Sequence, residues 1–230
     1  MIDLLKNDLP AHYGLHRSNI SVPSETTSEI RFDLTDKVMT SMVVEYRTGN
    51  ISFERESATL LEVINYERFL NGLSGTSFEK GRKRCDYIMY EKTAENFFLL
   101  NEQTSTLGTT ALLSKPILNK DKEVQYPGGK YEKVEVQLSG TLHTLMDVSS
   151  IATFIDRYKR KICLMSYIIK TREKEMPSAQ KAFATRYRQV EARETGEDGA
   201  LLECKPINDC GFEYRRISHD YIFRLSPEKP

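Results

Sequence analysis

The pattern of hydrophobic and polar positions in the first quarter of the chain predicts short strands. Residues 29–34 and 38–47 carry β-branched and apolar side chains, and the polar run Thr48-Gly49-Asn50 is typical of a turn into a third strand over residues 51–54. Residues 1–27 end in a polar segment rich in Ser and Thr, so we expect an N-terminal arm that docks loosely.

Between residues 58 and 73 the pattern becomes helical, because apolar residues recur near one face of a helix. Two apolar strands follow, over residues 85–90 and 96–103, and the short polar segment 91–95 between them suits a hairpin loop. The next segment, after Thr104, is long and irregular, and such segments in a compact domain are usually functional.

The second half of the chain predicts helices that alternate with strands. Apolar side chains on one side of residues 131–146 predict a long helix, and a second short helix is expected near residues 150–158. Residues 161–169 form a nearly continuous apolar run, as in a strand that is buried on both faces. The remaining predicted elements are a basic helix over 178–190 and late strands over 201–204, 212–216 and 221–225.

This order of elements predicts an α/β fold, with a mixed central β-sheet flanked by helices and with extra N- and C-terminal strands. A chain of 230 residues is long enough to bury a sizeable core. We therefore expect one α/β domain at residues 28–226, between the arm at 1–27 and a short tail at 227–230.

Composition narrows the class of protein. The chain has 33 Lys and Arg against 33 Asp and Glu, and zero net charge excludes a uniformly basic nucleic-acid-binding surface but allows a local basic patch. With no secretory leader, no long apolar run and four scattered cysteines, we expect a cytoplasmic protein that does not insert into a membrane. Because the sequence contains neither a Gly-rich phosphate loop nor a nucleophile elbow, ATP-driven chemistry and serine hydrolysis are not expected.

Two acidic residues lie at matching positions of the predicted hairpin. Asp86 is at the entry of its first strand and Glu102 near the exit of its second, and a hairpin centred on Ala94 makes them cross-strand neighbours. Two carboxylates with Cβ atoms roughly 5 Å apart repel each other unless a cation or a shared proton relieves them. A divalent cation such as Mg²⁺ accepts this pair together with water and phosphate oxygens. The alternative is that Glu102 ends a strand in solvent and Asp86 caps a turn.

Between residues 60 and 169 the sequence resembles the core of the PD-(D/E)XK nuclease-like superfamily, the restriction-endonuclease-like proteins. The resemblance rests on a predicted helix with Glu62, a strand that opens with Asp86, a strand that ends in Glu102 and a helix that contains Gln137. It implies that Asp86 and Glu102 bind Mg²⁺ or Mn²⁺, and that Glu62 and Gln137 complete the catalytic site.

The sequence departs from this family motif at one position. The family places a Lys two residues after the second acid, where this chain has Thr104. A strand shifted by one residue would put Asn101 and Gln103 in the places of the acid and the Lys, and both functional groups would be lost. A lysine of the following segment, Lys133 or Lys130, is the candidate for the missing catalytic role.

Positive charge is concentrated in two segments. Residues 80–84 directly precede the first acid of the pair, and residues 157–188 carry ten Lys and Arg against two Glu. Such clusters supply salt-sensitive contacts to nucleic-acid phosphates, although a solvated helix face is the alternative. The residues assigned to phosphate contacts are Lys80, Arg82, Lys83, Arg84, Lys159, Arg160, Lys161, Arg186 and Arg188.

Together these features predict a metal-dependent hydrolase, a nuclease that cuts the phosphodiester bonds of DNA or RNA in nucleic-acid processing or defence. The alternative is a catalytically inactive nuclease-like module that binds nucleic acid or a protein partner. A third hypothesis is that the chain is an adaptor with no role in nucleic-acid binding, whose basic face binds an acidic partner. The sequence marks no dimer face, so both a monomer and a homodimer stay open.

Overall fold

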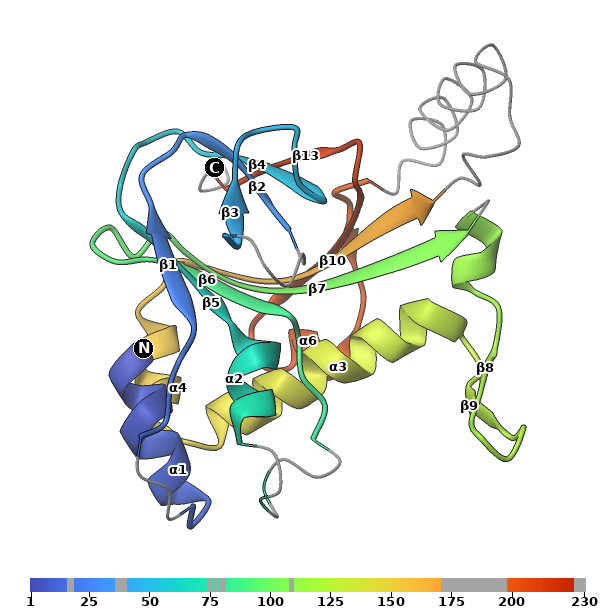
Figure 1. Cartoon of the computed structure of the whole chain (residues 1–230), viewed down its shortest axis with the longest axis horizontal. Helices are drawn as coiled ribbons and strands as arrows, with labels where there is room; N and C mark the ends of the chain where they lie inside the picture. Colours follow the sequence, from blue (N-terminus) through green and yellow to red (C-terminus); the bar gives the residue numbers. More distant parts are fainter. Residues whose placement is uncertain are drawn as a thin grey trace.

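The structure, a computed structural model, describes residues 1–15, 19–35, 41–73, 76, 78, 82–107, 110–170 and 198–225. A seven-stranded mixed sheet lies between a layer of helices and a smaller four-stranded sheet (Figure 1). The predicted α/β fold with a mixed central sheet is therefore confirmed. Within the described ranges, no helix is both long enough and apolar enough to cross a membrane.

The large sheet combines antiparallel and parallel pairing. Its strands, in spatial order, are β1 (Ser24–Thr27), β5 (Leu61–Asn65), β6 (Tyr87–Glu91), β7 (Phe97–Leu107), β10 (Arg160–Lys170), β12 (Glu213–Ser218) and β11 (Leu201–Leu202). The first four are antiparallel neighbours, whereas β10 runs parallel to both β7 and β12. Parallel strands need a crossover between them, and helices α3 and α4 supply it here.

The other elements surround this sheet. The small sheet has the order β13 (Ile222–Arg224), β4 (Ile51–Glu54), β2 (Arg31–Leu34) and β3 (Val43–Val44), and β8 (Ile117–Leu118) pairs with β9 (Val124–Tyr126). The helices are α1 (Leu9–His12, preceded by a π-helical turn at Leu4–Asp8), α2 (Tyr66–Gly72), α3 (Gly129–Met146), α4 (Ser149–Asp156) and α6 (Lys205–Asn208), with a 3₁₀ turn at Thr110–Leu113.

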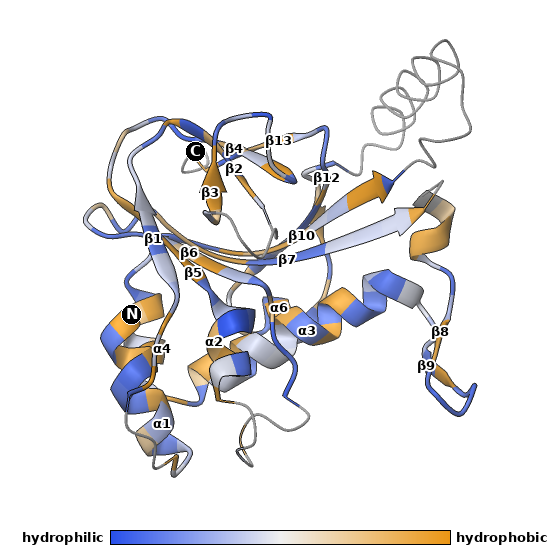
Figure 2. Cartoon of the chain, viewed as in Figure 1, coloured by the Kyte–Doolittle hydropathy of each residue, from blue (hydrophilic) through white to orange (hydrophobic). Residues whose placement is uncertain are grey.

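Both faces of the central sheet are buried, and alternate residues of each strand enter different cores. On β7, Phe98 and Leu100 pack in the core beneath the helices, whereas Phe97 and Leu99 pack in the core against the small sheet. This arrangement explains why the central strands have nearly continuous apolar sequences. Figure 2 shows the change along β7, whose second half is much less hydrophobic than its first.

The predicted hairpin is confirmed, with the expected register. Strands β6 and β7 pair Tyr87 with Asn101 and Ile88 with Leu100, so the hairpin is centred on Ala94. The expected long helix and the expected buried strand are also present, as α3 and β10. β7 extends four residues beyond the predicted end of its strand, as far as Leu107, because its outer half continues to pair with β10.

The predicted helix over residues 58–73 is wrong in its first half. Residues Leu61–Asn65 form β5, because Leu61, Val63 and Ile64 are completely buried between the two cores while their backbone pairs with β1 and β6. The helix α2 begins only after Asn65, whose side chain accepts a hydrogen bond from the backbone N–H of Arg68 at 2.7 Å. Sheet pairing thus overrides the local helical pattern.

The described part of the N-terminal segment is packed into the fold rather than loosely docked. Leu5 and Leu9 have no exposed surface, and Ser24–Thr27 form the edge strand β1. At the end of α1, Asp147 accepts hydrogen bonds from Tyr13 at 3.0 Å and His12 at 3.1 Å. The predicted basic helix over 178–190 lies outside the described residues.

A glycine in α3 allows the segment before β6 to cross the helix at close range. A Cβ atom at Gly140 would lie 2.6 Å from the Cβ atom of Lys83, which is closer than real Cβ contacts. Two residues later, the backbone N–H of Cys85 donates a hydrogen bond to Thr141 Oγ1 of α3 at 2.7 Å. Gly140 therefore determines how close the entry to β6 lies to α3.

We expect the substitution Gly140→Ala to destabilise the protein. Replacing Gly by Ala inside a helix normally stabilises it by about 1 kcal/mol, whereas forcing apart a close contact costs about 1–3 kcal/mol. The cost of the contact with Lys83 should exceed the gain in helix stability, so the Tm of the variant should be lower than that of the wild type in a thermal unfolding experiment. Gly72→Ala is the matched control, because nothing lies within 4 Å of a Cβ atom at that position. An equal rise in Tm for both variants would contradict the close contact.

Candidate functional site

Three hydrogen bonds from two different elements, α2 and β7, hold Asp86 in place. Its carbonyl oxygen accepts a hydrogen bond from Tyr66 N of α2 at 2.9 Å, and its N–H donates to Asn101 O of β7 at 3.0 Å. One oxygen of its carboxylate accepts a hydrogen bond from the backbone N–H of Gln103 at 2.6 Å. Asp86 is thus fixed at the point where α2 and the β6–β7 hairpin meet.

Glu102 lies on the face of β7 that is turned toward the helices. The alternation along β7 puts it on the same side as Phe98 and Leu100. Asp86 directly precedes β6, and its carboxylate lies at the backbone N–H of Gln103, the residue after Glu102. Glu102 is only 5% exposed, and its Oε2 atom is buried without a hydrogen-bond partner among the described residues. The two acids that the sequence analysis paired are therefore close enough for the charge of Asp86 to act on Glu102, while their direct pairing across the strands stays a prediction.

This environment raises the pKa of Glu102 well above its usual range. Burial is the largest cause, and the negative charge of Asp86 is the second. The positive charge of Lys133 and a hydrogen bond from the Gln137 side chain act in the opposite direction but do not cancel the effect. A buried carboxyl with a raised pKa beside a second carboxylate is typical of a functional site.

Helix α3 brings two of the predicted residues to the acid pair. Gln137 donates a hydrogen bond from Nε2 to Arg84 O at 3.2 Å, and its Oε1 atom is buried without a hydrogen-bond partner within the described ranges. Lys133 lies one turn earlier on the same helix, where its charge reaches Glu102. The lysine predicted to replace the missing motif residue is therefore next to the acid pair.

Glu62 does not contribute to this site, contrary to what the resemblance implied. It is a strand residue of β5, it is buried, and it forms an ion pair with Lys92 at 2.9 Å. Its partner across the sheet is Tyr90, four residues along β6 from Asp86, which is roughly 13 Å. The prediction was wrong because this part of the chain is a strand rather than a helix.

The helical glutamate beside the acid pair is instead Glu67, which the sequence analysis missed. It lies in the first turn of α2, its backbone N–H approaches Asp86 O at 3.4 Å, and its charge raises the pKa of Glu102. The sequence did contain a signal for it, because Asn65 is a helix-capping residue placed two positions before Glu67.

The alternative register, with Asn101 and Gln103 in place of the acid and the lysine, does not describe the site. Both side chains leave β7 on the opposite face. The Asn101 side chain donates hydrogen bonds to Ser166 Oγ at 3.0 Å and to Leu164 O at 3.1 Å. Gln103 Oε1 accepts a hydrogen bond from Asn50 at 3.1 Å. The register in which Glu102 is the second acid therefore holds, and Thr104 stands where the family motif has its lysine.

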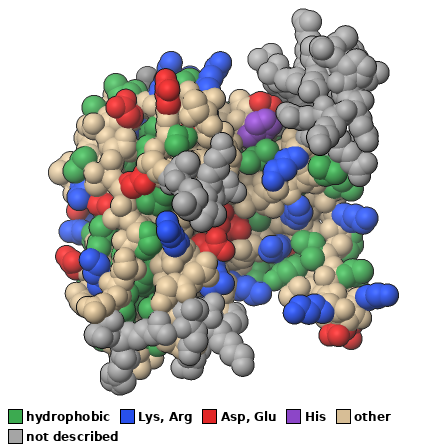
Figure 3. Space-filling view, in the orientation of Figure 1, with side chains coloured by type: hydrophobic (Ala, Val, Ile, Leu, Met, Phe, Trp, Pro, Cys, Tyr) green, Lys and Arg blue, Asp and Glu red, His purple; other side chains and the backbone are tan. Residues whose placement is uncertain are grey.

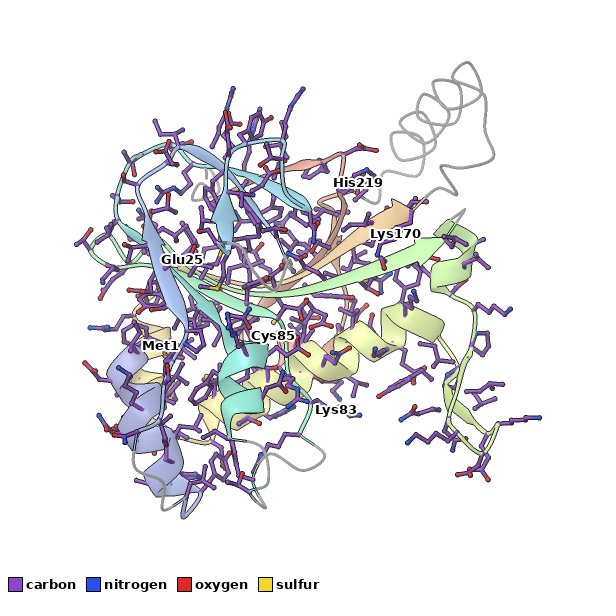
Figure 4. All side chains as sticks on the ribbon, viewed as in Figure 1. Met1, Glu25, Lys83, Cys85, Lys170 and His219 are labelled. Atoms are coloured by element: carbon purple, nitrogen blue, oxygen red, sulfur yellow. The ribbon has the colours of Figure 1, made fainter. Side chains whose placement is uncertain are left out.

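The predicted basic residues before Asp86 have partners within the protein. Arg82 packs against the rings of both Tyr13 and Phe78, with its guanidinium 4.2 and 4.4 Å from their centroids. Lys83 Nζ donates a hydrogen bond to the hydroxyl of Tyr126 at 2.9 Å, and Figure 4 shows Lys83 beside α3. The carbonyl of Arg84 receives the hydrogen bond from Gln137 described above. A role of these three residues in phosphate binding stays a prediction.

The predicted basic residues at the start of β10 and just before it lie far from the acid pair. Arg160 forms ion pairs with Glu213 at 2.9 Å, Lys161 with Asp156 at 2.9 Å, and Lys159 donates a hydrogen bond to Asn96 at 3.1 Å. Arg160 pairs with Phe97 on β7, five residues and roughly 16 Å from Glu102. Lys80, Arg186 and Arg188 lie outside the described residues.

The acid pair offers carboxylate oxygens of the kind that a divalent cation such as Mg²⁺ takes as ligands. Among the described residues, no group of three or more His, Cys, Asp and Glu side chains has the arrangement of a complete metal cage. Mg²⁺ needs only one or two carboxylates, because water and substrate oxygens fill the remaining positions. The buried side-chain oxygen atoms of Glu102 and Gln137 noted above are suitable hard donors. In the space-filling view, acidic side chains gather near the middle of the face where α2, β7 and α3 meet, with Lys and Arg around them (Figure 3).

Comparison with known proteins adds no relative to this picture. No family model matches the chain, and no curated protein or solved structure is found to be similar to it. The resemblance to PD-(D/E)XK nucleases therefore rests on the sequence motif and on the residues described above.

The raised pKa of Glu102 leads to a prediction about stability and pH. Since this pKa lies above its ordinary value of 4.5, the stability that the carboxyl contributes is fully present at lower pH and is lost as the pH rises through the raised pKa. Glu102→Gln removes this loss, so its Tm should exceed that of the wild type above neutral pH and converge with it in acid. A gain of about 1 kcal/mol would raise the Tm by roughly 2–4 °C.

Glu62→Gln is the matched control for this experiment. Glu62 is as deeply buried as Glu102 and lies on the same face of the sheet, but it is paired with Lys92. The control should be no more stable than the wild type at any pH. If Glu102→Gln behaves in the same way as the control, the electrostatic conflict at Glu102 is absent.

Proposed function

We propose that this chain is a hydrolase that uses a divalent cation, Mg²⁺ or Mn²⁺, to cut phosphodiester bonds in nucleic acid. The observation that carries the proposal is the buried oxygen atom of Glu102, which has no hydrogen-bond donor among the described residues, while the Asp86 carboxylate is held at the adjacent Gln103 N–H. An apo protein gains nothing from two carboxylates at such close range, and a bound cation removes both their repulsion and the missing contact.

Asp86 and Glu102 would hold the cation, with waters and the substrate as the other ligands. When bound, the ion would increase the acidity of a water molecule and neutralise negative charge on the phosphate. Asp86 is already oriented for this role, because its carboxylate is fixed by the N–H of Gln103. Glu102 must lose its proton, so cation binding should become tighter as the pH rises.

Gln137, Lys133 and Glu67 would support the reaction from the two helices beside the pair. The amide oxygen of Gln137, which no described donor reaches, can orient a water molecule, and its amide nitrogen is already anchored to Arg84 O. Lys133 is exposed and carries the positive charge next to Glu102, so it can contact a substrate phosphate. Glu67 adds a third negative charge at the rim, which favours a cation over an anion between the acids.

A second candidate function is a nuclease-like module that binds nucleic acid or a protein partner without cutting. Thr104 favours this candidate, because the position where the family motif has its lysine carries a side chain that cannot be charged. The two candidates share the fold and differ in whether Lys133 replaces the missing lysine.

Cleavage assays separate the two candidates. We expect labelled single- and double-stranded DNA and RNA to be cut in the presence of Mg²⁺ or Mn²⁺ and to remain intact with a chelator. The variants Asp86→Asn, Glu102→Gln and Lys133→Ala should each lose about 10²-fold or more of this activity. Glu62→Gln should retain it. Absence of cleavage by the wild type with either ion, while it still binds the substrate, would support the second candidate.

A further inference from the structure

Exposed apolar side chains are concentrated on and next to the hairpin of β8 and β9. Four of the eight large hydrophobic side chains that are exposed among the described residues lie between residues 107 and 124. Two of these four, Leu118 and Val124, are cross-strand partners in the hairpin and are 52% and 57% exposed. Figure 1 shows β8 and β9 extending away from both larger sheets, beyond the beginning of α3. Apolar side chains that gather on one exposed surface, rather than singly, mark an interaction site.

The two faces of this hairpin have different environments. Ile117 and Leu118 are consecutive residues of β8, so their side chains point to opposite faces. Their partners on β9 are Tyr126 and Val124, respectively, and cross-strand partners share a face. Tyr126 is buried, and its hydroxyl accepts the hydrogen bond from Lys83 described above. One face is therefore turned to the rest of the protein, and the face with Leu118 and Val124 is turned to solvent.

Hydrogen bonds and close packing hold the hairpin in one conformation. At its turn, Asn119 Oδ1 accepts hydrogen bonds from the backbone N–H groups of Asp121 and Glu123, both at 2.9 Å. At its base, Gly129 has a φ of +70°, and a Cβ atom there would lie 2.5 Å from Leu113 O. Leu113 itself is completely buried in the core beneath the helices. The exposed apolar face is thus preformed, which lowers the entropic cost of binding a partner.

The charges of the turn indicate what kind of partner fits this face. The turn carries four consecutive charged residues of alternating sign, with two positive and two negative charges: Lys120, Asp121, Lys122 and Glu123. All four are exposed, and within the described ranges none of them forms an ion pair. A polyanion such as nucleic acid would be attracted by the lysines and repelled by the acids. A second copy of the chain presents the same balanced set, and two such runs aligned antiparallel about their centre place each lysine opposite an acid.

We infer that the hairpin of β8 and β9 binds the same hairpin of a second copy of this chain, with Leu118 and Val124 in the centre of the interface and the alternating charges at its rim. This inference is independent of the proposed function. A contact made by the same surface on both copies is closed, so it gives a dimer rather than a filament. One hairpin offers less than the roughly 800 Å² that each partner buries in a stable interface, so we expect a weak dimer with a Kd of about 1–100 μM.

Sedimentation equilibrium of the full chain, loaded at roughly 1–500 μM, tests this dimer. The wild type should shift from monomer toward dimer as its concentration rises. Leu118→Thr/Val124→Thr should raise the Kd about tenfold or more, because it removes the apolar centre while Thr keeps a high β-propensity. The Tm of this variant at the lowest concentration should equal that of the wild type, since both side chains are exposed in the monomer.

Ile30→Thr/Leu201→Thr is the matched control, because it removes two apolar side chains that are 48% and 62% exposed on other surfaces. This control should dimerise as the wild type does. The inference is overturned if the wild type stays monomeric throughout, or if the hairpin variant dimerises as well as the control. A monomeric wild type whose binding to duplex DNA is weakened by the hairpin variant would assign the hairpin to nucleic acid instead.

An exchange of charges tests whether the partner is a second copy. Lys120→Glu/Lys122→Glu makes the charged run wholly acidic. Asp121→Lys/Glu123→Lys makes it wholly basic, and Asn119 Oδ1 still holds the turn because it contacts only backbone N–H groups. Each variant alone should dimerise about tenfold or more weakly than the wild type, whereas an equimolar mixture should associate more tightly than either. If the mixture associates no better than the separate variants, the two runs do not face each other and the inference is wrong.

Discussion

The burial of Glu102 next to Asp86 is the constraint on which the rest of the site depends. A carboxyl that is 5% exposed, with one oxygen that no described donor reaches and a second carboxylate close by, is costly in a folded protein. At Glu62, which is equally buried, an ion pair with Lys92 relieves this cost, whereas at Glu102 the fold does not relieve it. The surrounding elements instead hold Asp86 in place with backbone hydrogen bonds from both α2 and β7. We propose that a ligand that carries positive charge relieves this cost.

The architecture supports this site from both sides of the sheet. The small sheet covers one face of β6 and β7, so the hairpin that carries the acids is rigid and its side-chain alternation is fixed. The helices cover the other face only in part, because the apolar stretch of β7 ends at Leu100 and polar residues follow. The change from an apolar to a polar strand creates the boundary between core and site. Gly140 contributes by letting the chain approach α3 closely just before Asp86.

Positive charge is arranged differently from what a count of Lys and Arg suggests. The densest basic runs of the described sequence are largely used for internal contacts, such as the stacking of Arg82 on Tyr13 and the ion pair between Arg160 and Glu213. Local charge density in a sequence is thus a poor guide to a phosphate site, since arginine and lysine are also good structural residues.

The sequence by itself determined the α/β class, the β6–β7 hairpin with its register and the long helix α3. These features depend on short-range information, namely apolar periodicity and a symmetric turn around Ala94. It could not determine that residues 61–65 form a strand, because that depends on pairing with β1 and β6. Hence Glu62 was assigned to the site and Glu67 was missed. Contacts between distant segments are decided by the packing of the whole sheet, which no local pattern encodes.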